Sequence, residues 1–199
     1  MGRPALTKQE TVMPLSKPVP RQHLHTRDIV CKGYQREDGL WDIEGSICDV
    51  KTYSFENLSR NGISSGEPIH HMLIRLTIDN DLLIHEAEAA TESSPYNICP
   101  SIAGAFKNLK GVTIGPGWRR EIARIMGRTS GCTHLRDLLS GPVAVTAYQT
   151  IIPKRRQDGT IPAPSERPAV LNTCIAYAED GPIVRERWPD FFEEPTDNK

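Results

Sequence analysis

The chain has 199 residues, with 38% hydrophobic, 25% charged and 6% aromatic side chains, a composition that excludes a wholly disordered chain and allows one domain with its own core. Lys and Arg number 24 against 25 Asp and Glu, and this balanced charge argues against nucleic acid as a partner. Because no apolar run approaches the ~20 residues of a membrane span and no apolar export signal follows Met1, we expect a cytoplasmic protein with no membrane partner.

The first part of the chain predicts an arm followed by a hairpin. Residues 1–24 contain prolines but little apolar periodicity, which predicts a disordered arm because such a segment cannot offset the entropy lost on ordering. Apolar and polar residues then alternate from 41 to 47, the period of a half-buried strand. We therefore expect an antiparallel hairpin between Arg27 and Tyr53, with its turn at Glu37–Gly39.

The strongest strand pattern in the chain lies between His71 and Ala90. Alternate residues from 72 to 78 are apolar, and Asn80 and Asp81 provide a turn before a second strand at 82–90. One face of the first strand is therefore expected to enter the core. The residues of this face are Met72, Ile74, Leu76 and Ile78.

Beyond residue 95 the apolar period changes from two to that of a helix. Pro100 suits the first position of a helix, and Gly111 and Gly127 are typical helix ends. We expect three helices up to Ile152, the third with a kink at Pro142 because proline interrupts the helical hydrogen bonds.

The last part of the chain is expected to contain less regular structure. Residues 153–168 are rich in charge and proline, which predicts a linker loop. Residues 169–199 are expected to form a C-terminal hairpin, turning at Glu179–Gly181, and a tail packed on the core. The sequence as a whole predicts an α+β fold with its core domain at 25–152, in which an antiparallel sheet of hairpins is followed by about three helices packed on one face.

Five cysteines are spread through the chain without a CxxC pair, which argues against a disulfide framework. Cys99 and Cys132 precede the first and third predicted helices, where a helix N-terminus favours thiolate. Thiolates and imidazoles suit zinc or iron, although both cysteines could equally be small buried side chains. Without a metal, Cys132 and His134 would form a nucleophilic pair. The candidate metal ligands are Cys99, Cys132, His70, His71 and His134.

Two carboxylates on the first hairpin form a second candidate group. Asp42 and Glu44 are two residues apart on a predicted strand and share a face, whereas Asp49 falls on the other. Paired carboxylates can act as acid and base, and a solvated charged face is the alternative. Arg27 could pair with either of these two carboxylates, which would be a structural role. The candidate catalytic residues are Cys132, His134, Asp42 and Glu44, and the candidates for lining a substrate pocket are Trp41, Tyr96 and Trp118, the last of which could instead pack on the sheet.

The order of elements between residues 70 and 151 resembles the iron–sulfur scaffold proteins of the NifU and IscU type. In those proteins the last hairpin leads to a cysteine, a helix, and a second cysteine before a long helix. Cys99 and Cys132 occupy these two places, and His70 falls near the aspartate ligand of the scaffold. The scaffold's earlier cysteine is missing here, and Gly131 stands where the scaffold has a histidine. The resemblance therefore implies a mononuclear site of three or four ligands.

A closer resemblance covers nearly all of the structured chain. The phrases HTRDI (25–29), DGLWDIEG (38–45), IGPGW (114–118) and GCTHL (131–135) are similar to those of the bacterial domain-of-unknown-function family 2889. The resemblance implies no defined activity. The occurrence of its members in bacteria that degrade aromatic and other hydrophobic compounds implies a catabolic role on small molecules.

Three functions are consistent with these patterns. The first is an enzyme on a small organic molecule, in which the Cys/His cluster is a zinc or iron centre or a nucleophile. The second is a carrier or scaffold for a metal or an iron–sulfur cluster, which would hold its site at an exposed edge. The third is a non-catalytic binding module whose cysteines are scattered in the core. No organic cofactor and no particular oligomeric state are predicted.

Overall fold

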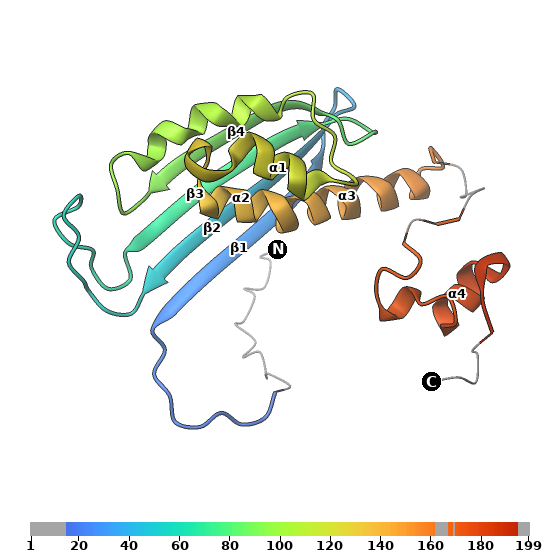
Figure 1. Cartoon of the computed structure of the whole chain (residues 1–199), viewed down its shortest axis with the longest axis horizontal. Helices are drawn as coiled ribbons and strands as arrows, with labels where there is room; N and C mark the ends of the chain where they lie inside the picture. Colours follow the sequence, from blue (N-terminus) through green and yellow to red (C-terminus); the bar gives the residue numbers. More distant parts are fainter. Residues whose placement is uncertain (1–14, 162–166, 169, 195–199) are drawn as a thin grey trace, which may run out of the picture.

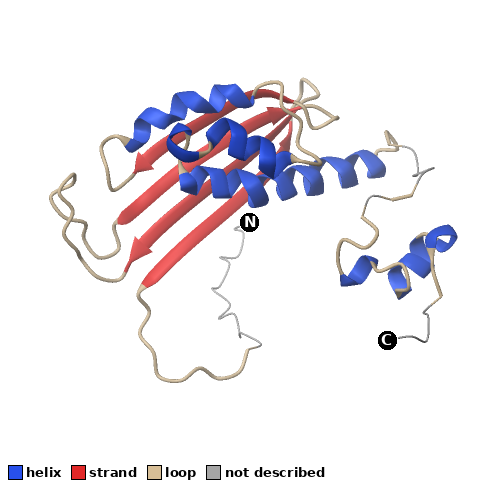
Figure 2. Cartoon of the chain, viewed as in Figure 1, coloured by secondary structure: helices blue, strands red, loops and turns tan. Residues whose placement is uncertain are grey.

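The computed structural model describes residues 15–161, 167–168 and 170–194 (Figure 1). Four strands form one antiparallel sheet in the order β1-β2-β3-β4, and helices lie over one of its faces (Figure 2). The α+β prediction is therefore confirmed. Most of the predicted arm, residues 1–14, lies outside the described residues. The strands are β1 (His25–Gln35), β2 (Trp41–Lys51), β3 (Pro68–Ile78) and β4 (Ile84–Ser93).

Each pair of neighbouring strands is a hairpin, and the alternation of side chains determines which residues enter the core. Along β2 every second residue from Trp41 to Asp49 is buried. Along β3 the predicted apolar face from Met72 to Ile78 is buried as well. The turn between β1 and β2 contains Gly39, whose φ of 86° is a conformation that glycine adopts without strain.

The helices follow the predicted order but differ in type. The first is a 3₁₀ helix, and the third is interrupted by a π-helical turn that contains Pro142, because proline lacks the N–H that an α-helix needs there. The helix α3 runs from Ala144 to Gln157, so the first five residues of the predicted linker, 153–157, are helical. The helices in this part are η1 (Cys99–Leu109), α1 (Trp118–Met126), η2 (Arg128–Ser130), α2 (Thr133–Leu138), η3 (Leu139–Val143) and α3 (Ala144–Gln157).

The core lies between the sheet and these helices, and two glycines of the sheet allow the close packing. A Cβ added at Gly45 would lie 2.7 Å from Val143 Cγ2, and one at Gly33 would overlap the side chain of Thr150. Buried side chains from both layers meet in one cluster. Its largest fully buried members include Ile43, Ile47, Leu76, Phe106, Ile122 and Leu135.

The predicted C-terminal hairpin is wrong, because the described residues from 170 to 194 contain three short helices and no strand. Gly181 precedes Pro182, which occupies the first turn of a helix where its fixed φ is favourable. The packing of this segment on the core stays a prediction. The helices are η4 (Ile175–Tyr177), α4 (Pro182–Arg187) and η5 (Pro189–Phe191). Among the described helices none has the length and apolar character required to cross a membrane.

Candidate functional site

A buried carboxylate marks one end of the sheet. Asp49 continues the buried alternation of β2 and is only 1% exposed. In the register of the sheet it lies between Arg27 on β1 and His70 on β3. The start of α2 adds His134 from the covering layer. We call these four residues, together with His25, the Asp49 cluster.

Asp49 accepts hydrogen bonds on both of its oxygens. The Arg27 guanidinium donates from Nε to Oδ1 at 2.7 Å and from Nη2 to Oδ2 at 2.8 Å. His25 Nε2 lies 3.1 Å from Oδ1, and His70 Nδ1 lies 3.0 Å from Oδ2. Each oxygen therefore has two partners, which fixes the orientation of the carboxylate and satisfies it as an anion.

The surroundings of Asp49 favour its ionised form. Burial opposes ionisation, but the hydrogen bonds and the positive charge of Arg27, together with the hydrogen bond from His25, hold the pKa of the Asp49 carboxyl below its usual value. The same contact raises the pKa of Arg27. The pair is consequently an ion pair at neutral pH.

Two histidines of the cluster, His70 and His134, are stacked on each other and favour the neutral form. The ring centroids of His70 and His134 are 3.8 Å apart, with an angle of 34° between the planes. Burial lowers the pKa of His70, and the neighbouring His134 lowers it further. Burial and the charge of Arg27 also lower the pKa of His134. Neutral imidazole is the form that binds a metal ion or accepts a proton.

The geometry of this cluster suits a single metal ion. One ligand atom each from Asp49, His70 and His134 lie within 4.8 Å of one another. Ligand atoms that share an ion at about 2.1 Å are about 4.2 Å apart or closer, so an ion would draw the three side chains slightly together. Two imidazoles and one carboxylate form the ligand set of several zinc hydrolases and of non-haem ferrous enzymes.

The structure brings together some of the predicted ligands and separates others. His70 and His134 meet at Asp49, and Cys132 Sγ lies 3.8 Å from His134 Nδ1. Within the described residues, the group of side chains that could hold a metal contains none of Cys99, Cys132 and His71. His71 pairs with Glu92 instead, because consecutive residues of a strand point to opposite faces. Cys99 begins η1, which packs along β4.

The other predicted site residues lie away from the Asp49 cluster. Asp42 and Glu44 are on the opposite face of the sheet, where Asp42 accepts a hydrogen bond from Thr77 Oγ1 at 2.7 Å. The indoles of Trp41 and Trp118 are buried in the core, and their N–H groups donate to Asn80 Oδ1 and to the Leu139 carbonyl. Both tryptophans therefore pack in the core with a satisfied N–H, which is the alternative that the sequence left open for Trp118. Tyr96 is 61% exposed in a loop.

Three residues of the cluster were not predicted as site residues, namely His25, Arg27 and Asp49. Asp49 was expected on the face opposite Asp42 and Glu44, which is confirmed, but it was not considered as a ligand. Arg27 pairs with Asp49 and not with the carboxylates of the other face. The signal available in the sequence was a carboxylate at a position where the alternation of β2 requires a buried residue.

Fold and site together define an α+β domain whose sheet carries histidines around one buried aspartate beneath a layer of helices. Residues 25–149 match the family described as "Protein of unknown function (DUF2889)", and the chain belongs to this family. All members of the Asp49 cluster fall inside the matched range. No curated protein and no solved structure is significantly similar to the chain.

Proposed function

We propose that this chain is an enzyme that acts on a small organic molecule and that Asp49, His70 and His134 bind one zinc or ferrous ion at its centre. The observation that carries the proposal is the convergence of three ligand atoms within 4.8 Å around a nearly inaccessible carboxylate. An ion pair between Asp49 and Arg27 would be complete without the two stacked histidines. Their placement from two further elements, β3 and α2, is therefore better explained by a shared ligand.

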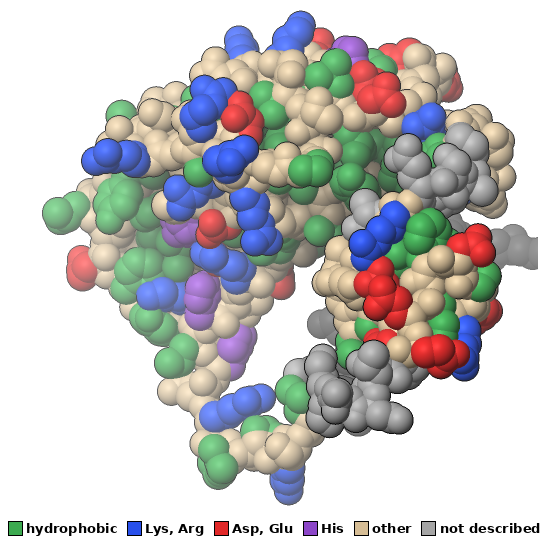
Figure 3. Space-filling view, turned by 45° about the vertical axis from the view of Figure 1, so that its right-hand side comes forward, with side chains coloured by type: hydrophobic (Ala, Val, Ile, Leu, Met, Phe, Trp, Pro, Cys, Tyr) green, Lys and Arg blue, Asp and Glu red, His purple; other side chains and the backbone are tan. Residues whose placement is uncertain are grey.

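The partial exposure of the cluster favours an enzyme over a purely structural site. The side chains of His70 and His134 are 16% and 23% exposed, whereas that of Asp49 is 2% exposed. A small molecule can therefore approach the imidazoles while the carboxylate remains shielded. Histidine side chains are visible at the surface among Lys and Arg side chains (Figure 3).

The residues around the three ligands have distinct roles in this proposal. A zinc or ferrous ion bound here would polarise a substrate oxygen or lower the pKa of a bound water. Arg27 and His25 hold the orientation of Asp49, as hydrogen-bonded neighbours of metal ligands commonly do. Because Arg27 balances the charge of Asp49, a bound divalent ion would keep its positive charge and favour substrates that carry or develop a negative charge.

The chain resembles a protein family whose members occur in bacteria that degrade aromatic and other hydrophobic compounds, and this supports a catabolic substrate of that class. We place the reaction in the bacterial cytoplasm, where the free thiols of the chain would remain reduced. A carrier of metal or iron–sulfur clusters would need to release its cargo at an exposed edge, and the burial of Asp49 favours the enzyme instead.

The direct test is the metal content of the chain, purified without chelator and measured by inductively coupled plasma mass spectrometry. We expect one zinc or iron per chain, and a loss of affinity of at least about tenfold in His70→Gln and in His134→Gln. His71→Gln is the matched control, because this histidine is adjacent in sequence but pairs with Glu92 on the other face. Equal metal content in all three variants would contradict the proposal.

A second candidate, a metal-free nucleophile, is favoured by the separation of 3.8 Å between Cys132 Sγ and His134 Nδ1. In that case His134 would accept the thiol proton and Cys132 would attack the substrate. Alkylation by iodoacetamide distinguishes the two candidates. A Cys132 that reacts much faster than Cys99, and slows in His134→Gln, would favour the nucleophile. A Cys132 with ordinary reactivity would leave the metal centre as the function.

A further inference from the structure

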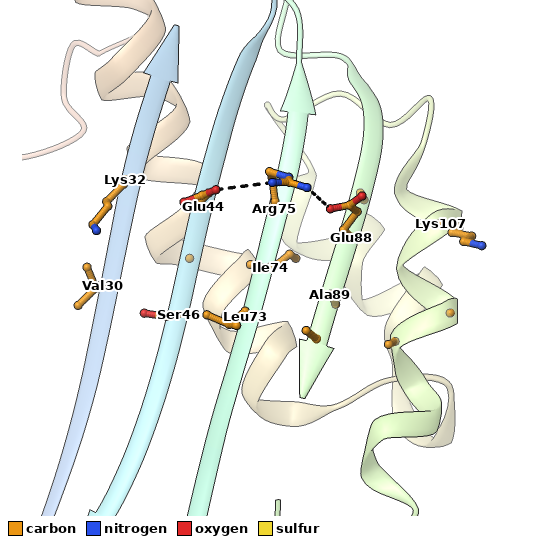
Figure 4. Close-up of a pocket in the computed structure, with 15 residues that line it drawn as sticks. Val30, Lys32, Glu44, Ser46, Leu73, Ile74, Arg75, Glu88, Ala89 and Lys107 are labelled. Atoms are coloured by element: carbon orange, nitrogen blue, oxygen red, sulfur yellow. Dashed lines mark hydrogen bonds and ion pairs between the residues drawn. The ribbon is translucent and has the colours of Figure 1, made fainter. Parts of the chain in front are cut away.

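The face of the sheet opposite the helices is exposed and has an ordered arrangement of side chains (Figure 4). We call it the open face. A hollow of about 770 Å³ lies over it, with Ala103, Gly104 and Lys107 of η1 along its side near β4. Val30 is 48% exposed there, although a β-branched apolar side chain on a sheet is usually packed against a second layer.

Charged residues cross the open face in one straight row. The registers of the three hairpins place Lys32 opposite Glu44, Glu44 opposite Arg75, and Arg75 opposite Glu88. The signs therefore alternate from β1 to β4 as plus, minus, plus and minus. Within the chain Arg75 pairs with both acidic neighbours, as Figure 4 shows.

The next row on the same face is mainly apolar. Here Val30 on β1 is opposite Ser46 on β2, which is opposite Leu73 on β3, and Leu73 is opposite Ala90 on β4. Large and small side chains alternate along this row. Such a row can interdigitate with another of the same kind if a large side chain meets a small one.

Each row is complementary, in charge or in side-chain size, to the same row of a second copy that runs in the opposite direction across the sheet. A twofold axis that runs parallel to the strands, between β2 and β3, places β1 of one copy over β4 of the other and β2 over β3. Lys32 then faces Glu88 of the second copy, and Glu44 faces Arg75. In the apolar row Val30 faces Ala90, and Ser46 faces Leu73. Each charge thus meets its opposite, and each large side chain meets a small one.

We propose that a second copy of this chain packs on the open face about this axis, so that the protein is a dimer of face-to-face sheets. Two equally twisted sheets related in this way keep their strands aligned, as in sandwiches. Four strands about 4.8 Å apart and eleven residues long at about 3.4 Å per residue make a face on the order of 700 Å². This is close to the roughly 800 Å² per partner that stable interfaces bury.

The test uses the charges at the two edges of the row. Lys32→Glu places two acidic residues opposite each other in the dimer, and Glu88→Lys places two lysines opposite each other. We expect the wild-type chain to sediment as a dimer at low micromolar concentration and each variant to dissociate with a dissociation constant at least about tenfold higher. An equimolar mixture of the two variants should restore the dimer, because every facing pair then has opposite signs.

Recovery of the dimer in the mixture shows that each variant lost association and not its fold, since each variant must be folded to form the mixed dimer. Arg124→Glu is the matched control. It reverses an exposed arginine that pairs with Glu121 on α1, away from the open face, and it should leave the dimer unchanged. A wild-type chain that remains monomeric would overturn the proposal, as would a mixture that stays dissociated or a Lys32→Glu variant that dimerises normally.

Discussion

The two faces of the sheet use charge in opposite ways. On the face covered by helices, Asp49 is the one buried charged residue of the described chain, and it is held by donors from β1 and β3. On the open face Glu44, Arg75 and Glu88 are about half exposed and pair side by side. A buried charge is costly unless it is fully paired, whereas exposed pairs contribute little to stability. The covered face therefore concentrates its charge at one buried point, whereas the open face spreads its charges across an exposed row.

The largest expected effect comes from removing the buried charge. Asp49→Asn leaves the Arg27 guanidinium without its counter-ion and weakens the hydrogen bond to His70. We expect the free energy of unfolding to fall by about 2–3 kcal/mol, below the usual range for a buried pair because Arg27 can be partly solvated. Urea denaturation monitored by circular dichroism measures this loss. A loss under about 0.5 kcal/mol, the level of an ordinary surface substitution, would mean that the two faces do not differ as described.

An intermediate effect on the free energy of unfolding is expected from pH, through the histidines of the covered face. Burial lowers the pKa of both His70 and His134 in the folded chain. The unfolded chain therefore binds more protons than the folded chain as pH falls below the ordinary histidine value of about 6.5. Stability should be fully present above that pH and should decrease as pH falls toward the folded pKa values.

Histidine variants on the two faces test whether the pH dependence of stability comes from the covered face. Urea midpoints measured from neutral to mildly acidic pH should decline less steeply in the double variant His70→Gln, His134→Gln than in the wild type. The open-face variant His71→Gln should keep the wild-type slope. If the double variant and the wild type decline in parallel, these two histidines are not the source of the effect.

The smallest effect is expected on the open face. Glu88→Gln removes one partner of the exposed pair with Arg75, and this should change the free energy of unfolding by less than about 1 kcal/mol. Urea denaturation should be measured at chain concentrations where the protein is monomeric, so that association does not contribute to the free energy of unfolding. A loss as large as that of Asp49→Asn would show that the open face is structurally coupled to the core.

The sequence allowed the faces of the strands to be predicted but not the site itself. Period-two alternation is a local property, so it correctly placed Met72–Ile78 in the core and Asp49 opposite Glu44. The residues that contact Asp49 are determined by the register of the strands and by the packing of the helices on the sheet. Arg27 faces it through the pairing of β1 with β2, and His134 reaches it because α2 packs on the sheet. Neither relation has a signal in neighbouring residues.

The cysteines also show that a local sequence feature does not predict which distant residues meet. Cys99 and Cys132 both precede helices, and this shared local feature predicted a shared site. Their helices pack on different parts of the sheet, since η1 lies along β4 while α2 contacts β2 and β3. In the C-terminal segment, Pro182 was the decisive residue. Its position after Gly181 favours a helix start, and this outweighed the turn signal that suggested a hairpin.

The most direct test of the proposed metal centre is X-ray absorption spectroscopy at the zinc or iron edge of the purified chain. We predict a first shell of nitrogen and oxygen only, at about 2.0–2.2 Å, with the multiple-scattering signature of two imidazoles. His134→Gln should remove one imidazole or the metal itself, and His71→Gln should leave the spectrum unchanged. A sulfur neighbour at about 2.3 Å, or a chain that binds neither metal when both are supplied in excess, would contradict the assignment of Asp49, His70 and His134 as the ligands.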